Sequence, residues 1–232
     1  MKIAIIPARG GSKRIPRKNV RFFCGRPIIE YSVKAAMESG LFDEVMVSTD
    51  DEEIAAIALS VGASVPFLRS VKSSDDFSST VDVLIEVINQ YEETGKTFDI
   101  GCCIYPTAPF VSVERLQQGF ELLQRKQFDV VFPICSFSYP ILRSLKLEDT
   151  GKVEMNWPAH LNARSQDLPK AYHDAGQFYW FDSAKLKQTR TLFGSNSGGV
   201  KISEMEVQDI DIEEDWEIAE LKYKYNHTAN DR

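Results

Sequence analysis

The chain has 232 residues, of which 43% are hydrophobic, and a formal net charge of −7 at pH 7. This composition suffices for one buried core, and the acidic balance argues against general binding to nucleic acid or to an anionic membrane. The four cysteines form no C-x-x-C pair, and no apolar stretch is long enough for a signal peptide or a membrane span. We therefore expect a cytoplasmic protein with free thiols.

Short apolar runs alternate with amphipathic segments along the first part of the chain. Strands are predicted at 3–6, 44–48, 65–68, 100–105 and 130–134. Helices are predicted from Pro27 to Gly40, after a capping pair formed by Asp50 and Glu53, along an apolar stripe at 81–91, and around 116–123. This alternation predicts an α/β fold with a mainly parallel sheet that helices cover on both faces.

The pattern changes at residues 136–172, where polarity is mixed and turn signals recur. We interpret this segment as an inserted extension between two parts of one α/β domain, 1–135 and 173–232. In the second part, strands are predicted at 178–181 and 207–210, and a closing helix over 212–225. Because ligands of such sheets bind at the carboxyl ends of strands, residues 7–19, 49–51 and 106–110 should line one crevice.

The turn after the first strand is strongly basic. Residues 1–26 contain several Lys and Arg residues and no Asp or Glu. Arg9, Lys13 and Lys18 can balance phosphate charge, and Gly10 and Gly11 let the backbone approach a phosphate closely. Neither G-x-x-x-x-G-K-[ST] nor G-x-G-x-x-G is present, which argues against a P-loop ATPase or a dinucleotide dehydrogenase. We expect the loop to bind a triphosphate that loses pyrophosphate; the alternative is a solvated basic loop.

An acidic pair, Asp209 and Asp211, precedes the predicted closing helix. Residues i and i+2 of a strand project to the same face, so the two carboxylates can converge. Hard oxygen ligands with open positions suit Mg²⁺ bound to phosphates. The alternative is that these carboxylates only cap the helix.

Polar and aromatic residues are concentrated in two runs, 162–169 and 172–180. They suit a polyhydroxylated acidic substrate, and Arg164 can make a bidentate pair with a carboxylate. His173, beside Asp174, is a candidate acid–base group, although a structural histidine is the more common case. Ordinary surface turns are the alternative interpretation of this region.

Together these segments resemble the acylneuraminate cytidylyltransferases. The resemblance is carried by I-P-A-R-G-G-S-K at 6–13, I-P-R-K-N at 15–19, V-S-T-D at 47–50, P-T-A-P at 106–109 and Q-D-I-D at 208–211. It implies a Rossmann-like nucleotidyltransferase fold with a small dimerisation extension, a homodimer, CTP as the donor and Mg²⁺ as the cofactor. It also implies transfer of CMP to the anomeric hydroxyl of a nine-carbon acidic sugar, with release of pyrophosphate.

The run Y-H-D-A-G-Q-F-Y-W at 172–180 looks like the pseudaminic acid branch of this family. Tyr105 stands where the sialic acid enzymes have a sugar-contacting glutamine, which favours a less hydroxylated sugar. Legionaminic acid, N-acetylneuraminic acid and 3-deoxy-manno-octulosonate are the alternative substrates. A non-catalytic nucleotide-binding module is the alternative from a different class.

By the same resemblance, functional roles fall on particular residues. The catalytic set is Arg9, Lys13, Lys18 and Asp211, which stabilise charge during in-line attack on the α-phosphorus. Asp209 and Asp211 are the metal ligands. Nucleotide contacts fall on Ala8, Arg9, Gly10, Ser12, Lys13, Lys18, Asn19, Ser79 and Thr80. Sugar contacts fall on Tyr105, Arg164, Gln166, Tyr172, His173, Gln177 and Tyr179.

Overall fold

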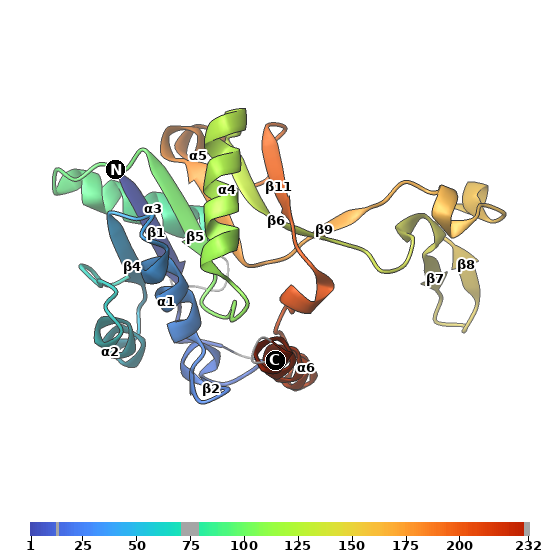
Figure 1. Cartoon of the computed structure of the whole chain (residues 1–232), viewed down its shortest axis with the longest axis horizontal. Helices are drawn as coiled ribbons and strands as arrows, with labels where there is room; N and C mark the ends of the chain where they lie inside the picture. The colour runs from blue at the N-terminus through green and yellow to red at the C-terminus, as the bar shows by residue number, and fades with distance from the viewer. Residues whose placement is uncertain (13, 71–78, 230–232) are drawn as a thin grey trace.

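The computed structural model describes residues 1–12, 14–70 and 79–229. Within these ranges a seven-stranded sheet forms the centre of the molecule (Figure 1). Its strands are β1 (Lys2–Pro7), β4 (Glu44–Ser48), β5 (Ile100–Ile104), β6 (Val130–Ser136), β9 (Tyr172–Asp174), β10 (Phe178–Asp182) and β11 (Ser197–Lys201). Their order across the sheet is β11, β6, β10, β5, β1, β4, and β9 pairs with the end of β6.

The sheet is mixed and mostly parallel. β1 lies parallel to both β4 and β5, and β11 lies parallel to β6. β10 runs antiparallel between β5 and β6. This arrangement confirms the predicted fold class, and it brings the carboxyl ends of β1, β4 and β5 to one edge of the sheet.

Helices cover both faces of the sheet, as predicted. On one face lie α1 (Ile29–Ser39), α2 (Glu52–Ser60) and α4 (Val113–Lys126), which pack in a core with Ala4 and Ile6. On the other face lie α3 (Thr80–Glu93) and α5 (Ser183–Thr189), which pack with Ile3 and Ile5. Because successive residues of β1 face opposite cores and all four are fully buried, the strand has a continuous apolar sequence.

The last helix, α6 (Glu213–Ala229), closes a smaller core against the turn formed by β2 (Phe22–Phe23) and β3 (Arg26–Pro27). Ile15 and Trp216 are both buried there, so the basic loop and the C-terminal helix pack into the same small core. None of the helices in the described ranges is long and apolar enough to cross a membrane.

Several predicted elements were wrong. Residues 65–68 form no strand, since the backbone there makes only a single bridge between Ser64 and Met46 before turning away. Residues 207–210 lie outside any strand of the described chain, and β11 takes the edge position instead. The cap of α2 is Asp51, whose carboxylate accepts a hydrogen bond from the N–H of Ile54 (3.0 Å), because Asp50 is bonded elsewhere.

The chain between β6 and β9 forms an arm that projects away from the sheet (Figure 1). β6 and β9 pair antiparallel at its root, where Ser136 lies opposite Tyr172. Beyond the root are a hairpin and short turns, namely β7 (Leu145–Leu147), β8 (Val153–Met155), η3 (Ile141–Arg143), η4 (Pro158–His160) and η5 (Ser165–Asp167). Leu145, Leu147 and Leu161 of the arm are 62%, 72% and 61% exposed, so the arm leaves apolar surface in water.

Candidate active site

The basic loop after β1 lies beside the acidic residues that follow β4. The N–H of Gly10 donates to the carboxylate of Asp50 (2.9 Å), and Nδ2 of Asn19, in η1 (Lys18–Val20), donates to the carbonyl of Arg9 (2.8 Å). A Cβ on Gly10 would lie 2.6 Å from Oδ2 of Asp51, so only glycine permits this close approach. The acidic residues therefore shape the loop.

Arg17 ties the end of the loop to the start of α2. Its backbone is left-handed (φ 55°), and its guanidinium pairs with Asp51 (2.5 Å) and with Glu53. The hydrogen bond from Arg17, followed by the N–H of Ile54, lowers the pKa of Asp51 from 3.8 to about 2 despite partial burial. Arg17 thus holds the end of the loop against the start of α2, although its side chain is 42% exposed.

We expect Asp51→Asn to lower the melting temperature by about 2 °C at pH 7, because the ion pair with Arg17 is lost while asparagine still caps α2. A carboxyl with a lowered pKa stabilises the fold fully above its ordinary value of 3.8, and this stabilisation disappears as the pH falls toward 2. Melting curves of both proteins should therefore converge between pH 4 and pH 2. Glu52→Gln, an exposed neighbour, is the control, and a difference that persists at pH 2 would contradict the ion-pair explanation.

A hollow of about 400 Å³ opens at this loop. Of the predicted nucleotide contacts, Arg9, Ser12, Lys18 and Asn19 line it; the remaining lining residues are Pro7, Gly11, Arg14, Pro106, Thr107 and Asp211. Clustered cations and a glycine-containing loop suit a polyphosphate. Ala8 is fully buried in the core instead, and Lys13 lies outside the described residues.

The predicted metal ligands lie between η6 (Glu204–Glu206) and α6. Asp211 pairs with Arg14 (2.7 Å), and its Oδ1 lies 3.8 Å from Nζ of Lys18. Burial raises the pKa of Asp209, and the negative charge of Asp211 raises it further. Burial also lowers the pKa of Lys18, whereas the negative charge of Asp211 acts to raise it. Asp211, Arg14 and Lys18 thus meet in the lining of this hollow, and Asp209 lies two residues away in the chain.

Two contacts fix the backbone of this acidic segment. Nζ of Lys18 donates to the carbonyl of Ile210, a residue that is itself buried against α6. Asp215, in the first turn of α6, accepts hydrogen bonds from the N–H groups of Asp211 (2.9 Å) and Ile212 (3.0 Å). Sequence reasoning missed Asp215, because several acidic residues begin α6 and nothing in their spacing distinguishes the one that bonds back.

The donor set of Asp209 and Asp211 fits Mg²⁺. Both are oxygen ligands. Burial, and after it the negative charge of Asp211, raises the pKa of Asp209, so a divalent cation at this position would relieve an unfavourable negative charge. In the part of the chain that the structure describes, no group of three or more His, Cys, Asp or Glu side chains could hold a metal. Two protein carboxylates with phosphate oxygens and waters are the usual set for Mg²⁺ at a nucleotide.

A second hollow, of about 720 Å³, lies on the other side of the acidic segment. Tyr105, His173 and Tyr179 of the predicted sugar contacts line it, as do Asp209 and Asp211. The further lining residues are Cys135, Asp174, Ala175, Gly176, Glu204, Val207, Gln208, Asp215 and Lys222. Because Asp211 lines both hollows, a group bound in one can meet a group bound in the other.

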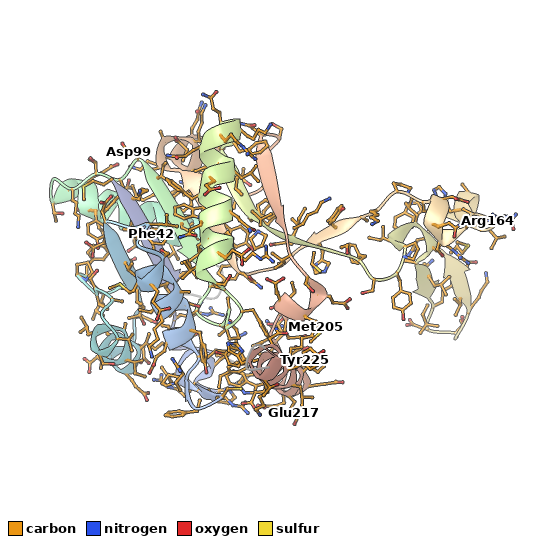
Figure 2. All side chains as sticks on the ribbon, viewed as in Figure 1. Phe42, Asp99, Arg164, Met205, Glu217 and Tyr225 are labelled. Carbon is orange, nitrogen blue, oxygen red and sulfur yellow. The ribbon has the colours of Figure 1, made fainter. Side chains whose placement is uncertain are left out.

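The other predicted sugar contacts lie elsewhere. Arg164 and Gln166 are on the arm, and Figure 2 shows Arg164 at the end farthest from the sheet. Gln177 is buried, and its Nε2 donates to the carbonyl of Glu206 (2.5 Å). Tyr172 is exposed at the root of the arm, with Nζ of Lys201 5.0 Å from its ring centre. Within a single chain, these four side chains do not line the second hollow.

The two predicted contacts at the start of α3 have structural partners. Ser79 caps the helix in a reciprocal capping box with Asp82. Thr80 Oγ1 lies 3.5 Å from the hydroxyl of Tyr105, so Thr80 orients Tyr105, which lines the second hollow. Arg69 is a residue that sequence reasoning missed: its guanidinium donates to the carbonyl of Ser48 (2.6 Å), near Asp50 and Arg9.

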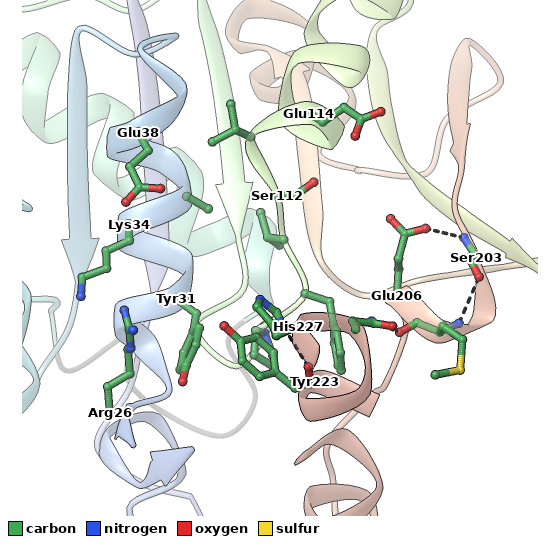
Figure 3. A pocket seen from close by; sticks show the side chains of 17 residues that line it. Arg26, Tyr31, Lys34, Glu38, Ser112, Glu114, Ser203, Glu206, Tyr223 and His227 are labelled. Carbon is green, nitrogen blue, oxygen red and sulfur yellow. Dashed lines mark hydrogen bonds between the residues drawn. The ribbon is translucent and has the colours of Figure 1, made fainter. Parts of the chain in front are cut away.

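A hollow of about 660 Å³ between α1 and α6 is separate from these sites (Figure 3). Arg26 and Tyr31 line it on one side, and Tyr223 and His227 line it on the other. It contains none of the predicted site residues that the structure describes.

The chain is similar to known cytidylyltransferases. The family model described as cytidylyltransferase matches residues 3–208. A pseudaminic acid cytidylyltransferase of Campylobacter jejuni is 43% identical over 227 residues, which cover 98% of each chain. N-acylneuraminate cytidylyltransferase A of Danio rerio is 35% identical over 222 residues, which cover 94% of this chain and 50% of that protein.

A solved structure supports the fold independently. The structure of a CMP:2-keto-3-deoxy-manno-octonic acid synthetase complexed with CTP superposes with a TM-score of 0.72 at 16% identity, covering 97% of this chain and 99% of that one. At this identity, the similarity shows a shared fold and nothing finer.

Proposed function

Because this chain belongs to the cytidylyltransferase family, we propose that it transfers CMP from CTP to the anomeric hydroxyl of pseudaminic acid and releases pyrophosphate. The main support for the proposal is the position of Asp211. This residue lines both the hollow of about 400 Å³ at the basic loop and the hollow of about 720 Å³. A triphosphate in the first hollow and a sugar in the second would meet at this carboxylate, where the new bond must form.

The reaction is an in-line displacement in which the sugar hydroxyl attacks the α-phosphorus and the bond to pyrophosphate breaks. Arg9 and Lys18 bind the phosphates and stabilise the charge that develops on them, because both line the nucleotide hollow. Asp209 and Asp211 would hold Mg²⁺, which when bound neutralises phosphate oxygens and makes the hydroxyl more acidic. Arg14, paired with Asp211, is a further phosphate contact in this proposal.

The larger hollow supports a sugar with apolar substituents. Tyr105 and Tyr179 line it with ring centres 5.4 Å apart, and Ala175 and Val207 add apolar surface. Aromatic faces pack well against acyl and methyl groups and offer few partners to additional hydroxyls. Pseudaminic acid, with two acylamino groups and a terminal methyl group, suits this lining.

We propose that the protein is a homodimer and that each arm completes the sugar site of its partner. The sugar carries a carboxylate, yet among the described lining residues only Lys222 and His173 offer a cation. Lys222 already donates to the carbonyls of Val207 (2.7 Å) and Glu204 (3.1 Å). Arg164, on an arm with exposed apolar side chains, would supply the missing bidentate partner from the second subunit.

Complementation tests this arrangement. Arg164→Ala and Asp211→Asn should each inactivate their homodimers, Arg164→Ala by about 10- to 100-fold. If the arm acts in trans, refolding the two variants together should restore about one quarter of wild-type activity, because half of the dimers are mixed and each holds one intact site. Each refolded variant alone is the control. No recovery despite mixed dimers would assign Arg164 to its own chain or to no site.

The proposed function itself is tested by pyrophosphate release. We expect release to require Mg²⁺, the sugar and CTP together, and to be at least about tenfold slower with UTP or ATP. Release from CTP at the same rate without any sugar would contradict transfer to a sugar, since water would then be the acceptor.

A further inference from the structure

A carboxylate lies in the sugar hollow at a position that neither the phosphates nor the metal explains. Asp174 ends β9 and lines the 720 Å³ hollow beside Tyr179. Its Oδ2 accepts a hydrogen bond from the hydroxyl of Tyr179 (2.5 Å), and its Oδ1 accepts one from the N–H of Gly176 (3.0 Å). Both oxygens are therefore held in a fixed orientation.

This negative charge is unfavourable for an acidic sugar. Among the described lining residues, Asp209, Asp211 and Glu204 already make the hollow acidic. Burial raises the pKa of Tyr105 and raises that of Tyr179 far above its ordinary value, so both phenols stay neutral and add no further negative charge near Asp174. A fixed carboxylate at this position repels an anion unless the anion also donates a hydrogen bond to it.

The carboxylate can still accept such a bond. An ionised carboxylate offers about four acceptor positions, and the two hydrogen bonds from Tyr179 and Gly176 occupy about half of them. Near Asp174, aromatic or apolar surface comes from Tyr179, which bonds to it, from Tyr105, whose ring centre lies 5.4 Å from that of Tyr179, and from the adjacent Ala175. A fixed acceptor beside apolar walls matches a group with one N–H donor and an apolar end.

We propose that Asp174 determines substrate specificity by accepting the N–H of an acylamino substituent, whose acyl group packs against Tyr105 and Tyr179. This inference rests on the proposed function, and it names the residue that recognises an acylamino group of the sugar. A hydroxyl at the same carbon also donates a hydrogen bond, but it leaves the aromatic walls without a partner.

The test compares two substrates that differ at one carbon, pseudaminic acid and a deoxy analogue with one acylamino group replaced by hydrogen, for each acylamino position in turn. At the acylamino position that Asp174 contacts, Asp174→Asn should lower kcat/KM for pseudaminic acid by about 10- to 100-fold, because a charge-assisted hydrogen bond is lost. The same substitution should lower kcat/KM for the analogue much less. The ratio of the two values should fall accordingly. Tyr179→Phe, which frees one carboxylate oxygen, should lower the same ratio by a smaller factor.

Glu204→Gln is the matched control, because it removes another carboxylate of the same hollow, one that accepts a hydrogen bond from Ser138 (2.9 Å). It should leave the ratio unchanged. CTP binding by calorimetry shows that each variant is folded. If the ratio is unchanged in Asp174→Asn at every acylamino position, the role proposed for Asp174 is wrong, while the proposed function stands. A wild-type protein that binds CTP but charges no acidic sugar overturns the proposed function and this inference with it.

Discussion

Replacing Asp211 with asparagine should lower kcat about a thousandfold or more while leaving the melting temperature within about 2 °C of the wild type. Asp211 lines both hollows and pairs with Arg14, so its carboxylate lies where nucleotide, metal and sugar would meet. Asparagine keeps the size of the side chain but removes the charge that a divalent cation needs. Stability should change little, because Asp211 is 37% exposed and exposed ion pairs contribute little to folding.

Two measurements distinguish this role from a structural one. Mn²⁺ binding in the presence of CTP, followed by electron paramagnetic resonance, should weaken in Asp211→Asn together with turnover. Glu213→Gln is the control, because Glu213 is an acidic residue two positions away that pairs with Arg21 (2.7 Å) outside both hollows. Turnover of Asp211→Asn within tenfold of the wild type would contradict the metal assignment.

Lys18→Met should lower kcat/KM for CTP by about 100- to 1,000-fold. Lys18 lines the hollow of about 400 Å³ at the basic loop, and its ammonium also donates a hydrogen bond to the carbonyl of Ile210 in the acidic segment. The side chain is 18% exposed, so its charge acts in a poorly screened environment. Methionine keeps much of the volume but removes both the charge and the hydrogen bond to Ile210.

Lys34→Met serves as the matched control for Lys18→Met. Lys34 lies on α1, pairs with Glu30 (3.2 Å) and lines the separate hollow between α1 and α6. It should leave kcat/KM for CTP unchanged. Equal CTP affinity and turnover in wild type and Lys18→Met would remove Lys18 from the nucleotide site.

The central sheet could be predicted because its strands are buried on both faces. Such strands are continuous apolar runs, and the amphipathic helices between them mark the crossovers. β11 could not be predicted, because Gly198 and Gly199 weaken the strand signal of its sequence. A Cβ at Gly198 would lie 2.4 Å from the ring of Phe128, so packing against a distant aromatic residue requires glycine in this edge strand. Tertiary packing overrides local propensity there.

The predicted site is only partly visible in the sequence. The basic loop and the acidic pair are short motifs. The loop follows β1 at the edge of the sheet, whereas the acidic pair follows no strand and is held there by the packing of Ile210 and by the bond from Lys18 to its carbonyl. Asp51 bonds to Arg17, which is distant in the sequence, and Asp174 and Asp215 accept bonds from backbone N–H groups. These contacts depend on the folded backbone, so the sequence motifs do not reveal them. In the proposed homodimer, the place of Arg164 would depend on how the second chain packs, so a single sequence cannot determine it.

CMP-sugar formation from CTP and Mg²⁺, measured with three acids in parallel, tests whether the enzyme transfers CMP to pseudaminic acid. We expect kcat/KM for pseudaminic acid to exceed the values for legionaminic and N-acetylneuraminic acids by about tenfold or more. Preferred transfer to either of the other two acids would keep the cytidylyltransferase chemistry and contradict the sugar assignment. No CMP-sugar with any of the three would contradict the proposed function.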